Sequence, residues 1–232
     1  EQDLPQQSEL GRTLALITSV VTTTIELLTD QSRLGETDGL TGLLNRTRVL
    51  AGAKRLLGAD PSPRSIAFFL FDVDHFKHYN DANGHLPGDE LLKALSLLLR
   101  EKTREEEIVG RYGGEEFLIA MPNAGREAAL RAAERIRALI AATPFPHREK
   151  QPGGCLSISG GLSVWPIDGE DLETLLKRAD QALYAAKRAG RNRVHAWATA
   201  EPDAGLAPNR VGEAVARALL DDQSENGPEP DA

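Results

Sequence analysis

The residues best suited to chemistry are two adjacent carboxylates, Glu115 and Glu116, which directly follow the pair Gly113–Gly114. The glycines stand between two β-prone runs, residues 107–112 and 117–121. Adjacent glycines in that setting predict a β-hairpin whose tight turn needs positive φ angles. Crowding two like charges beside a turn gains the fold nothing, so the pair indicates metal or phosphate chemistry carried on a hairpin.

A second set of acids, Asp72 and Asp74, follows a continuous apolar run at residues 65–71, which predicts a buried central strand. Because carboxylates are costly to desolvate inside such a strand, acids at its end belong at the mouth of a site. If the hairpin pairs beside this strand, one glutamate meets Asp72. The other should be peripheral, because neighbouring side chains on a strand point to opposite faces. Asp74 is expected only to cap the helix that starts at His75.

Asp72, one glutamate and a backbone carbonyl such as that of Val73 make an oxygen-only ligand set. Such a set suits Mg²⁺ or Mn²⁺ shared with substrate phosphates, rather than zinc. In polymerase-like and cyclase-like catalysis these metals polarise a phosphate and lower the pKa of an attacking hydroxyl. Three cations are candidates for holding the phosphates, namely Lys77, Lys187 and Arg191.

The elements that must position these groups follow from the hydrophobic periodicity. Helices are predicted from a glycine-rich turn to about residue 57, and at 76–83, 89–100, 126–142 and 171–189. Strands are predicted at 65–71, in the hairpin, at 156–165 and at 193–197. The order β-α-β-β-α-β, followed by a further helix and strand, predicts an α+β fold of the ferredoxin-like type.

Composition excludes several function classes. The formal charge of the 232 residues is −8, and residues 201–232 carry −6 of it, so the body is near balance. A basic nucleic-acid-binding surface is therefore not expected. No apolar run reaches the roughly 20 residues of a membrane span, and a single cysteine, Cys155, excludes an internal disulfide framework. We expect a cytoplasmic protein.

The chain also resembles a known family, through five motif blocks in sequence order. They are residues 38–46, 71–81, 84–89, 111–117 and 179–192, the fourth containing Gly-Gly-Glu-Glu-Phe. Over residues 35–197 the chain looks like a GGDEF domain, a diguanylate cyclase, in its GGEEF variant form. The resemblance implies a fold like that of nucleotidyl cyclases and polymerase palms. It also implies condensation of two GTP into cyclic di-GMP and two pyrophosphates, across a homodimer in which each subunit holds one GTP.

Carried over position by position, the resemblance assigns Mg²⁺ (or Mn²⁺) to Asp72, Glu115 and the carbonyl of Val73. Glu115 would also activate the 3′-hydroxyl, with Glu116 a secondary contributor. The implied substrate-binding residues are Asn80 and Asp89 at the guanine edge with His85 nearby, and the backbone of His75 and Phe76 with Lys77, Lys187 and Arg191 at the phosphates.

Asp89 also discriminates between nucleotides. A carboxylate accepts hydrogen bonds from N1 and N2 of guanine, whereas N1 of adenine is an acceptor and would leave the acid unpaired. This favours GTP over ATP and disfavours an adenylate-type cyclase.

One segment departs from the family. Its product-inhibition site is Arg-x-x-Asp, and the matching segment here runs from Arg104 to Glu107, so glutamate replaces aspartate. Arg135, on the following helix, is the candidate second arginine. The charge is kept on a longer side chain, so we expect cyclic di-GMP to be both product and a candidate inhibitor.

Three regions are expected around this domain. Residues 1–36 have the apolar spacing of an amphipathic helix, either packed on its own domain or, as we favour, a coiled-coil signalling stalk. Residues 37–199 form the catalytic domain, and residues 200–232 an acidic tail with a short amphipathic segment. The chain begins at Glu1 and its only methionine is Met121, so an upstream sensor or regulatory domain is expected to be missing.

Two function classes stay open. One is an active diguanylate cyclase in bacterial second-messenger signalling. The other is a module that binds GTP or cyclic di-GMP and regulates a neighbour without turnover. The intact signature favours the enzyme, because inactive relatives usually depart at one or more of the site positions.

Overall fold

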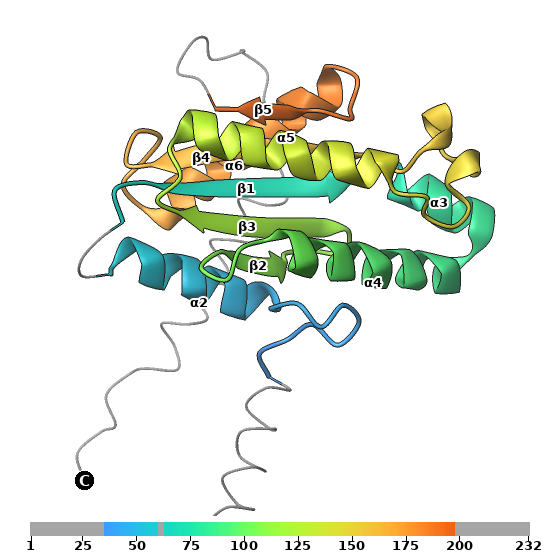
Figure 1. Ribbon diagram of the computed structural model, residues 1–232, viewed down its shortest axis with the longest axis horizontal. Helices are drawn as coiled ribbons and strands as arrows, with labels where there is room; N and C mark the ends of the chain where they lie inside the picture. Colours follow the sequence, from blue (N-terminus) through green and yellow to red (C-terminus); the bar gives the residue numbers. More distant parts are fainter. Residues whose placement is uncertain (1–34, 60–62, 198–232) are drawn as a thin grey trace, which may run out of the picture.

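A five-stranded sheet with helices on both faces organises residues 35–59 and 63–197, the part of the chain that this computed structural model describes (Figure 1). The strands are β1 (Ile66–Val73), β2 (Ile108–Arg111), β3 (Glu116–Pro122), β4 (Ile158–Trp165) and β5 (Val194–Ala196). Their order is β2-β3-β1-β4-β5, with β1 antiparallel to β3 and β4, β2 antiparallel to β3, and β5 parallel to β4. The predicted ferredoxin-like arrangement, with one added strand, is confirmed.

The helices are α2 (Arg46–Leu57), α3 (Phe76–Asn83), α4 (His85–Lys102), α5 (Arg126–Ala142) and α6 (Leu172–Arg188), with 3-10 turns η1 (Arg148–Lys150) and η2 (Pro152–Gly154). Every residue of β1 is buried. Its Phe69 and Phe71 join one core cluster with residues of α4 and α5, whereas Phe68 and Leu70 join a second with residues of α2 and α6. Burial on both faces explains the continuous apolar run in the sequence.

Strand β1 continues two residues beyond its predicted end. Asp72 and Val73 still pair with Ser159 and Ile158 of β4. The acid is therefore inside the strand, only 7% exposed. Its burial is offset by an ion pair, in which Lys187 Nζ lies 2.9 Å from Asp72 Oδ1.

The loop between β2 and β3 differs from the predicted tight turn. It comprises residues 112–115, and neither Gly113 nor Gly114 takes a positive φ. A Cβ at Gly113 would lie 2.3 Å from Glu116 Oε2, whereas one at Gly114 would meet nothing within 4 Å. A side chain at position 113 would therefore have to displace the Glu116 carboxylate, and the prediction of positive φ angles at the two glycines is wrong.

Helix α4 begins earlier than predicted. It starts at His85, after Gly84 with φ 92°, and so includes most of the block 84–89. Pro87 is compatible with this start because the first helical N–H groups have no intrahelical partner. Asp89 therefore lies on the helix itself.

The predicted N-terminal helix and acidic tail fall outside the described residues, apart from Gly35 and Glu36, and stay predictions. Within residues 35–59 and 63–197 no helix combines the length and the apolar character needed to cross a membrane.

Candidate active site

Four charged side chains lie where β1 ends, β3 begins and α6 ends. Asp72 forms the ion pair with Lys187 of α6. The β1–β3 register places the Cα of Glu116 opposite that of Asp72. The main-chain N–H of Val73 donates to the carbonyl of Glu115 at 3.2 Å. The structure thus brings the signature glutamates to the end of the central strand, as the sequence predicted.

The electrostatics of this group favour an added cation. Burial raises the pKa of the Asp72 carboxyl, and Lys187 opposes the rise. Burial, and then the charge of Asp72, also raise the pKa of Glu115 and of Glu116. A divalent cation would stabilise all three ionised carboxylates, so the donors fit Mg²⁺ or Mn²⁺. No three His, Cys, Asp or Glu side chains among the described residues are arranged to hold a metal alone, so carbonyl and phosphate oxygens would have to complete its coordination.

The two glutamates are not separated in the way that strand alternation predicted. Strand β3 begins at Glu116, so Glu115 belongs to the preceding loop and the alternation rule does not apply to it. Glu116 is the residue directly opposite Asp72. The charge of Asp72 raises the pKa of both glutamates, and the prediction that one of them is peripheral to the site stays a prediction.

A polar group that the sequence did not single out surrounds Glu116. The guanidinium of Arg46 lies 4.6 Å from the centre of the Tyr112 ring, and its Nη2 is 3.4 Å from the Tyr112 hydroxyl. Burial raises the pKa of Tyr112 to about 12. Asp180 on α6 is only 7% exposed. Its negative charge raises the pKa of Glu116, and the positive charge of Arg46 lowers the same pKa. Arg46 and Asp180 both stand in the motif blocks, and this was the only signal for them.

Arg111 anchors the signature loop and was also missed. Its Nη1 donates to both carboxylate oxygens of Asp38, at 3.0 and 3.1 Å. Its Nε and Nη2 donate to the carbonyl of Gly114, at 3.1 and 2.7 Å. Burial alone would raise the pKa of Asp38, but hydrogen bonds from Thr41 and Arg111 outweigh it and lower that pKa. The residue before Glu115 is thus held to the turn that precedes α2.

Asp74 does not cap the next helix, contrary to the prediction. Helix α3 begins at Phe76, and its N-cap residue is His75, which makes no side-chain capping bond. The carboxylate of Asp74 instead accepts hydrogen bonds from the hydroxyls of Ser157 and Ser159 and from the main-chain N–H of Asn192.

The predicted phosphate-binding residues form two groups. His75, with φ 58°, Phe76 and Lys77 make the bend at the start of α3, where helical N–H groups lack intrahelical partners. Lys187 and Arg191 lie at the end of α6 and in the turn after it. Both lower the pKa of Asp72, so both cations act on the same end of β1.

The predicted guanine-binding residues lie where α3 meets α4. Asn80 Oδ1 is buried and has no hydrogen-bond partner in the described structure. A Cβ on Gly88 would lie 1.9 Å from that oxygen. Asp89 follows Gly88 and is half-buried, and His85 is exposed at the start of α4. A buried acceptor without a donor, next to a carboxylate, is a place for a ligand that carries N–H groups.

The predicted inhibitory residues lie at the other end of α4. The main-chain N–H of Arg104 donates to Glu107 Oε2 at 2.9 Å, and that of Glu107 donates back to the carbonyl of Arg104 at 3.1 Å. Arg135 lines a separate cavity of about 200 Å³, together with Glu101 and Lys102.

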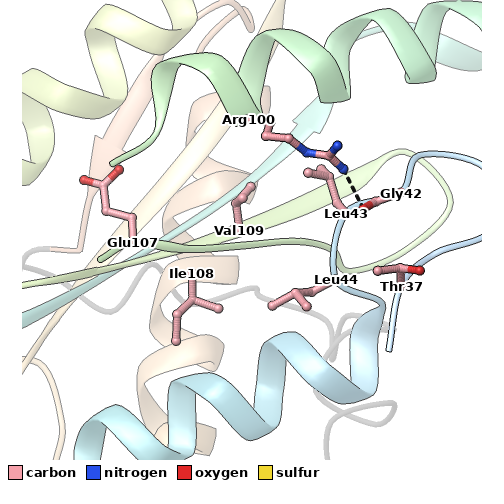
Figure 2. A pocket seen from close by; sticks show the side chains of 8 residues that line it. All are labelled: Thr37, Gly42, Leu43, Leu44, Arg100, Glu107, Ile108 and Val109. Atoms are coloured by element: carbon pink, nitrogen blue, oxygen red, sulfur yellow. Dashed lines mark hydrogen bonds between the residues drawn. The ribbon is translucent and has the colours of Figure 1, made fainter. Parts of the chain in front are cut away.

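Glu107 lies instead at the edge of a second pocket. Figure 2 shows this pocket, of about 400 Å³, with Arg100 donating from Nη2 to the carbonyl of Gly42 at 2.6 Å. Its apolar lining comes from Leu43, Leu44, Ile108 and Val109. The structure therefore does not bring Glu107 and Arg135 into one cavity, and their common site stays a prediction.

Comparison with known proteins places these features in one family. The model of the family described as "Diguanylate cyclase, GGDEF domain" matches residues 36–193. The chain is 40% identical over 173 residues to diguanylate cyclase DgcP of Pseudomonas aeruginosa, covering 72% of this chain and 25% of that protein. It is 41% identical over 167 residues to the response regulator PleD of Caulobacter vibrioides, covering 69% and 36%. The chain therefore spans about a quarter to a third of the length of these relatives.

Solved structures agree. The coiled coil and GGDEF domain of DgcB from Caulobacter crescentus, in complex with c-di-GMP, matches with a TM-score of 0.70 and 30% identity, over 81% of this chain and 98% of that one. The active GGEEF domain of a diguanylate cyclase from Vibrio cholerae matches with a TM-score of 0.62 and 33% identity, over 68% and 99%.

Proposed function

Because this chain belongs to the GGDEF family of diguanylate cyclases, we propose that it condenses two GTP into cyclic di-GMP and two pyrophosphates. The observation that carries the proposal is the convergence of Asp72, Glu115, Glu116 and Lys187 at the end of the central strand. We further propose that it acts in the GGEEF form, because residues 113–117 read Gly-Gly-Glu-Glu-Phe.

Asp72, Glu115 and the Val73 carbonyl would hold Mg²⁺, or Mn²⁺, which when bound polarises the α-phosphate and lowers the pKa of the attacking 3′-hydroxyl. Glu115 accepts the proton of that hydroxyl as a general base. The 3′-oxygen bonds to the α-phosphorus of the other GTP while the bond to the β-phosphate oxygen breaks. Pyrophosphate leaves, and the second, equivalent step closes the ring.

The remaining side chains bind and orient the substrate. Lys77, Lys187 and Arg191, with the N–H groups at His75 and Phe76, hold the triphosphate. Glu116, across from Asp72, supports the same cluster as a secondary contributor.

Guanine is read between α3 and α4. Asn80 Oδ1 lacks a donor within the described structure, and the 2-amino group of guanine supplies one, whereas adenine carries only C–H at that position. Asp89 accepts from N1 and N2 of the base, with His85 nearby. This selects GTP over ATP.

Assembly and control complete the proposal. One domain holds one GTP, so each 3′-hydroxyl must attack the nucleotide of a second copy in a homodimer. The DgcB structures are complexes with c-di-GMP, which supports cyclic di-GMP as a ligand as well as a product. Arg104, Glu107 and Arg135 would bind it as an inhibitor, and an upstream sensor domain would supply the input signal.

The test is turnover by the purified chain with GTP and Mg²⁺. We expect cyclic di-GMP and pyrophosphate in a 1:2 ratio, at a rate per protomer that rises with protein concentration, and no cyclic product from ATP. Glu115→Gln should lower the rate about 10²-fold or more. Tight GTP binding with no cyclic product at any protein concentration would instead identify a regulatory binding module.

A further inference from the structure

Asp74 is a buried acid whose side-chain hydrogen bonds go to two segments that flank the candidate active site. It is 2% exposed. Its Oδ1 accepts from Ser159 Oγ at 2.6 Å, and its Oδ2 accepts from Ser157 Oγ at 2.7 Å and from the main-chain N–H of Asn192 at 3.0 Å. Its own main-chain N–H donates to the carbonyl of Ser157 at 2.9 Å. Neither a helix cap nor a metal ligand explains this arrangement.

The bond to Asn192 fixes an unusual turn. After α6, three successive residues have positive φ, at 111° for Gly190, 62° for Arg191 and 47° for Asn192. Residues with a Cβ adopt this region only where surrounding contacts hold them there. Asn192 is held by Asp74, which accepts from its N–H, and by Arg137 Nη1, which donates to its Oδ1 at 2.8 Å. The Arg191 N–H donates to the Ala186 carbonyl at 3.1 Å, and the Arg191 carbonyl accepts from Arg193 Nε at 2.9 Å. The Gly190 N–H donates to the Lys187 carbonyl at 3.3 Å.

The side chain of Arg191 has no such anchor. Its guanidinium makes no hydrogen bond or ion pair in residues 35–59 and 63–197, and it is exposed. Its charge nevertheless acts on Asp72. The position of the guanidinium is therefore set by the backbone of the turn, and the turn is tied to the end of β1 through Asp74.

We propose that Asp74 is a positioning residue for the substrate triphosphate, acting through Arg191 by holding the turn at residues 190–193. The inference rests on the proposed function, in which Arg191 binds phosphate. The role of Asp74 is that of a hydrogen-bond acceptor, and its negative charge is not needed for it. In Asp74→Asn the amide oxygen can replace Oδ2 as the acceptor. The amide NH₂ can then donate to Ser159, because a serine hydroxyl can accept a hydrogen bond as well as donate one. Asp74→Ala removes all three bonds.

The test is the affinity for GTP and for GMP in EDTA, where turnover is blocked and no metal contributes. We expect Asp74→Ala to weaken the binding of GTP at least tenfold and the binding of GMP less than twofold. The affinities of Asp74→Asn for both nucleotides should stay within about threefold of those of the wild type. Because Asp74 acts through Arg191, the double variant Asp74→Ala/Arg191→Ala should bind GTP no more weakly than Arg191→Ala alone. Any of three results would overturn the inference. They are an Asn variant that binds GTP as weakly as the Ala variant, equal losses of affinity for GTP and GMP, and additive losses of GTP affinity in the double variant.

Two buried serines of β4 give a matched pair that also serves if Asp74→Ala does not fold. Ser159 and Ser163 are both fully buried; Ser159 donates to Asp74, whereas Ser163 donates to the carbonyl of Leu175 at 2.7 Å. Ser159→Ala should weaken the binding of GTP two- to fivefold, whereas Ser163→Ala should leave the affinity for GTP unchanged. Equal effects would contradict the inference. A wild type that binds GTP no better than GMP in EDTA would also overturn the inference, whereas the proposed function is rejected separately, by the absence of cyclic di-GMP when GTP and Mg²⁺ are supplied.

Discussion

Lys187 Nζ lies 2.9 Å from Asp72 Oδ1 and so joins the end of the last long helix to the end of the central strand. The pair is placed by two different elements, because Lys187 stands in the last turn of α6 and Asp72 is the seventh residue of β1. It is the contact that most strongly opposes the rise in the pKa of Asp72 that burial causes.

Lys187→Ala should therefore change both the size and the pH dependence of activity. Without the ammonium group the pKa of Asp72 rises further, so the acid limb of the kcat/KM profile should move to higher pH, and the plateau should fall about 10²-fold. Steady-state rates from pH 5 to 9 test this. Lys177→Ala, at an exposed lysine of the same helix, is the control and should change neither. An unshifted acid limb would show that Asp72 does not limit the rate at low pH.

Glu116→Gln should stabilise the metal-free domain at neutral pH. Burial, then Asp72, raise the pKa of Glu116 in the folded protein. Folding therefore disfavours the ionised form of Glu116. The resulting loss of stability is complete at pH values above the raised pKa of the folded protein, and it vanishes at pH values below the ordinary pKa of 4.5. Thermal unfolding in EDTA should show a higher Tm for the variant at pH 7 to 8, by about 2–4 °C per kcal/mol, and no gain near pH 4.5.

The control for that prediction is Glu127→Gln, at a side chain that is 88% exposed. Its Tm should follow the wild type at every pH. A Glu116→Gln gain that does not change with pH would show that packing, and not the buried charge, causes it.

Gly88→Ala should damage nucleotide binding selectively. The added Cβ would lie 1.9 Å from Asn80 Oδ1 and displace the amide, although alanine is favoured over glycine within a helix by about 1 kcal/mol. We expect the KM for GTP to rise at least about tenfold, with a folded domain by circular dichroism. Gly58→Ala, whose Cβ would meet only the Lys54 carbonyl at 3.8 Å, should bind GTP normally. Unchanged GTP binding by Gly88→Ala would remove Asn80 from the site.

The sequence predicted the elements and the place of the site because both depend on local pattern. β1 is buried on both faces and so reads as an apolar run, and α5 matches its predicted bounds, residues 126–142, because its ends and periodicity are both clear. The motif blocks indicated which acids, amides and cations to look for at the end of that strand.

What pattern could not predict are polar contacts between distant segments. Arg111 and Asp38 are 73 residues apart, and Asp74 and Asn192 are 118 residues apart. No periodicity records such pairs, so Asp74 was read as a cap for its nearest helix. Gly113 was misread for a local reason, because residue types alone do not show that the Glu116 carboxylate, three residues further on, folds over it.

Glu107→Asp should strengthen inhibition by cyclic di-GMP. Glu107 Oε2 is engaged by the main-chain N–H of its own turn, at Arg104, so a ligand must compete for it. An aspartate is one methylene shorter, which withdraws the carboxylate from that N–H and restores the residue of the family's inhibitory site. Initial rates with added cyclic di-GMP should give an inhibition constant about tenfold lower, equivalent to about 1.4 kcal/mol. Glu105→Asp, at an exposed glutamate of the same turn, is the control and should not alter inhibition. A wild type and a Glu107→Asp variant that are equally insensitive to cyclic di-GMP would exclude this turn as the inhibitory site.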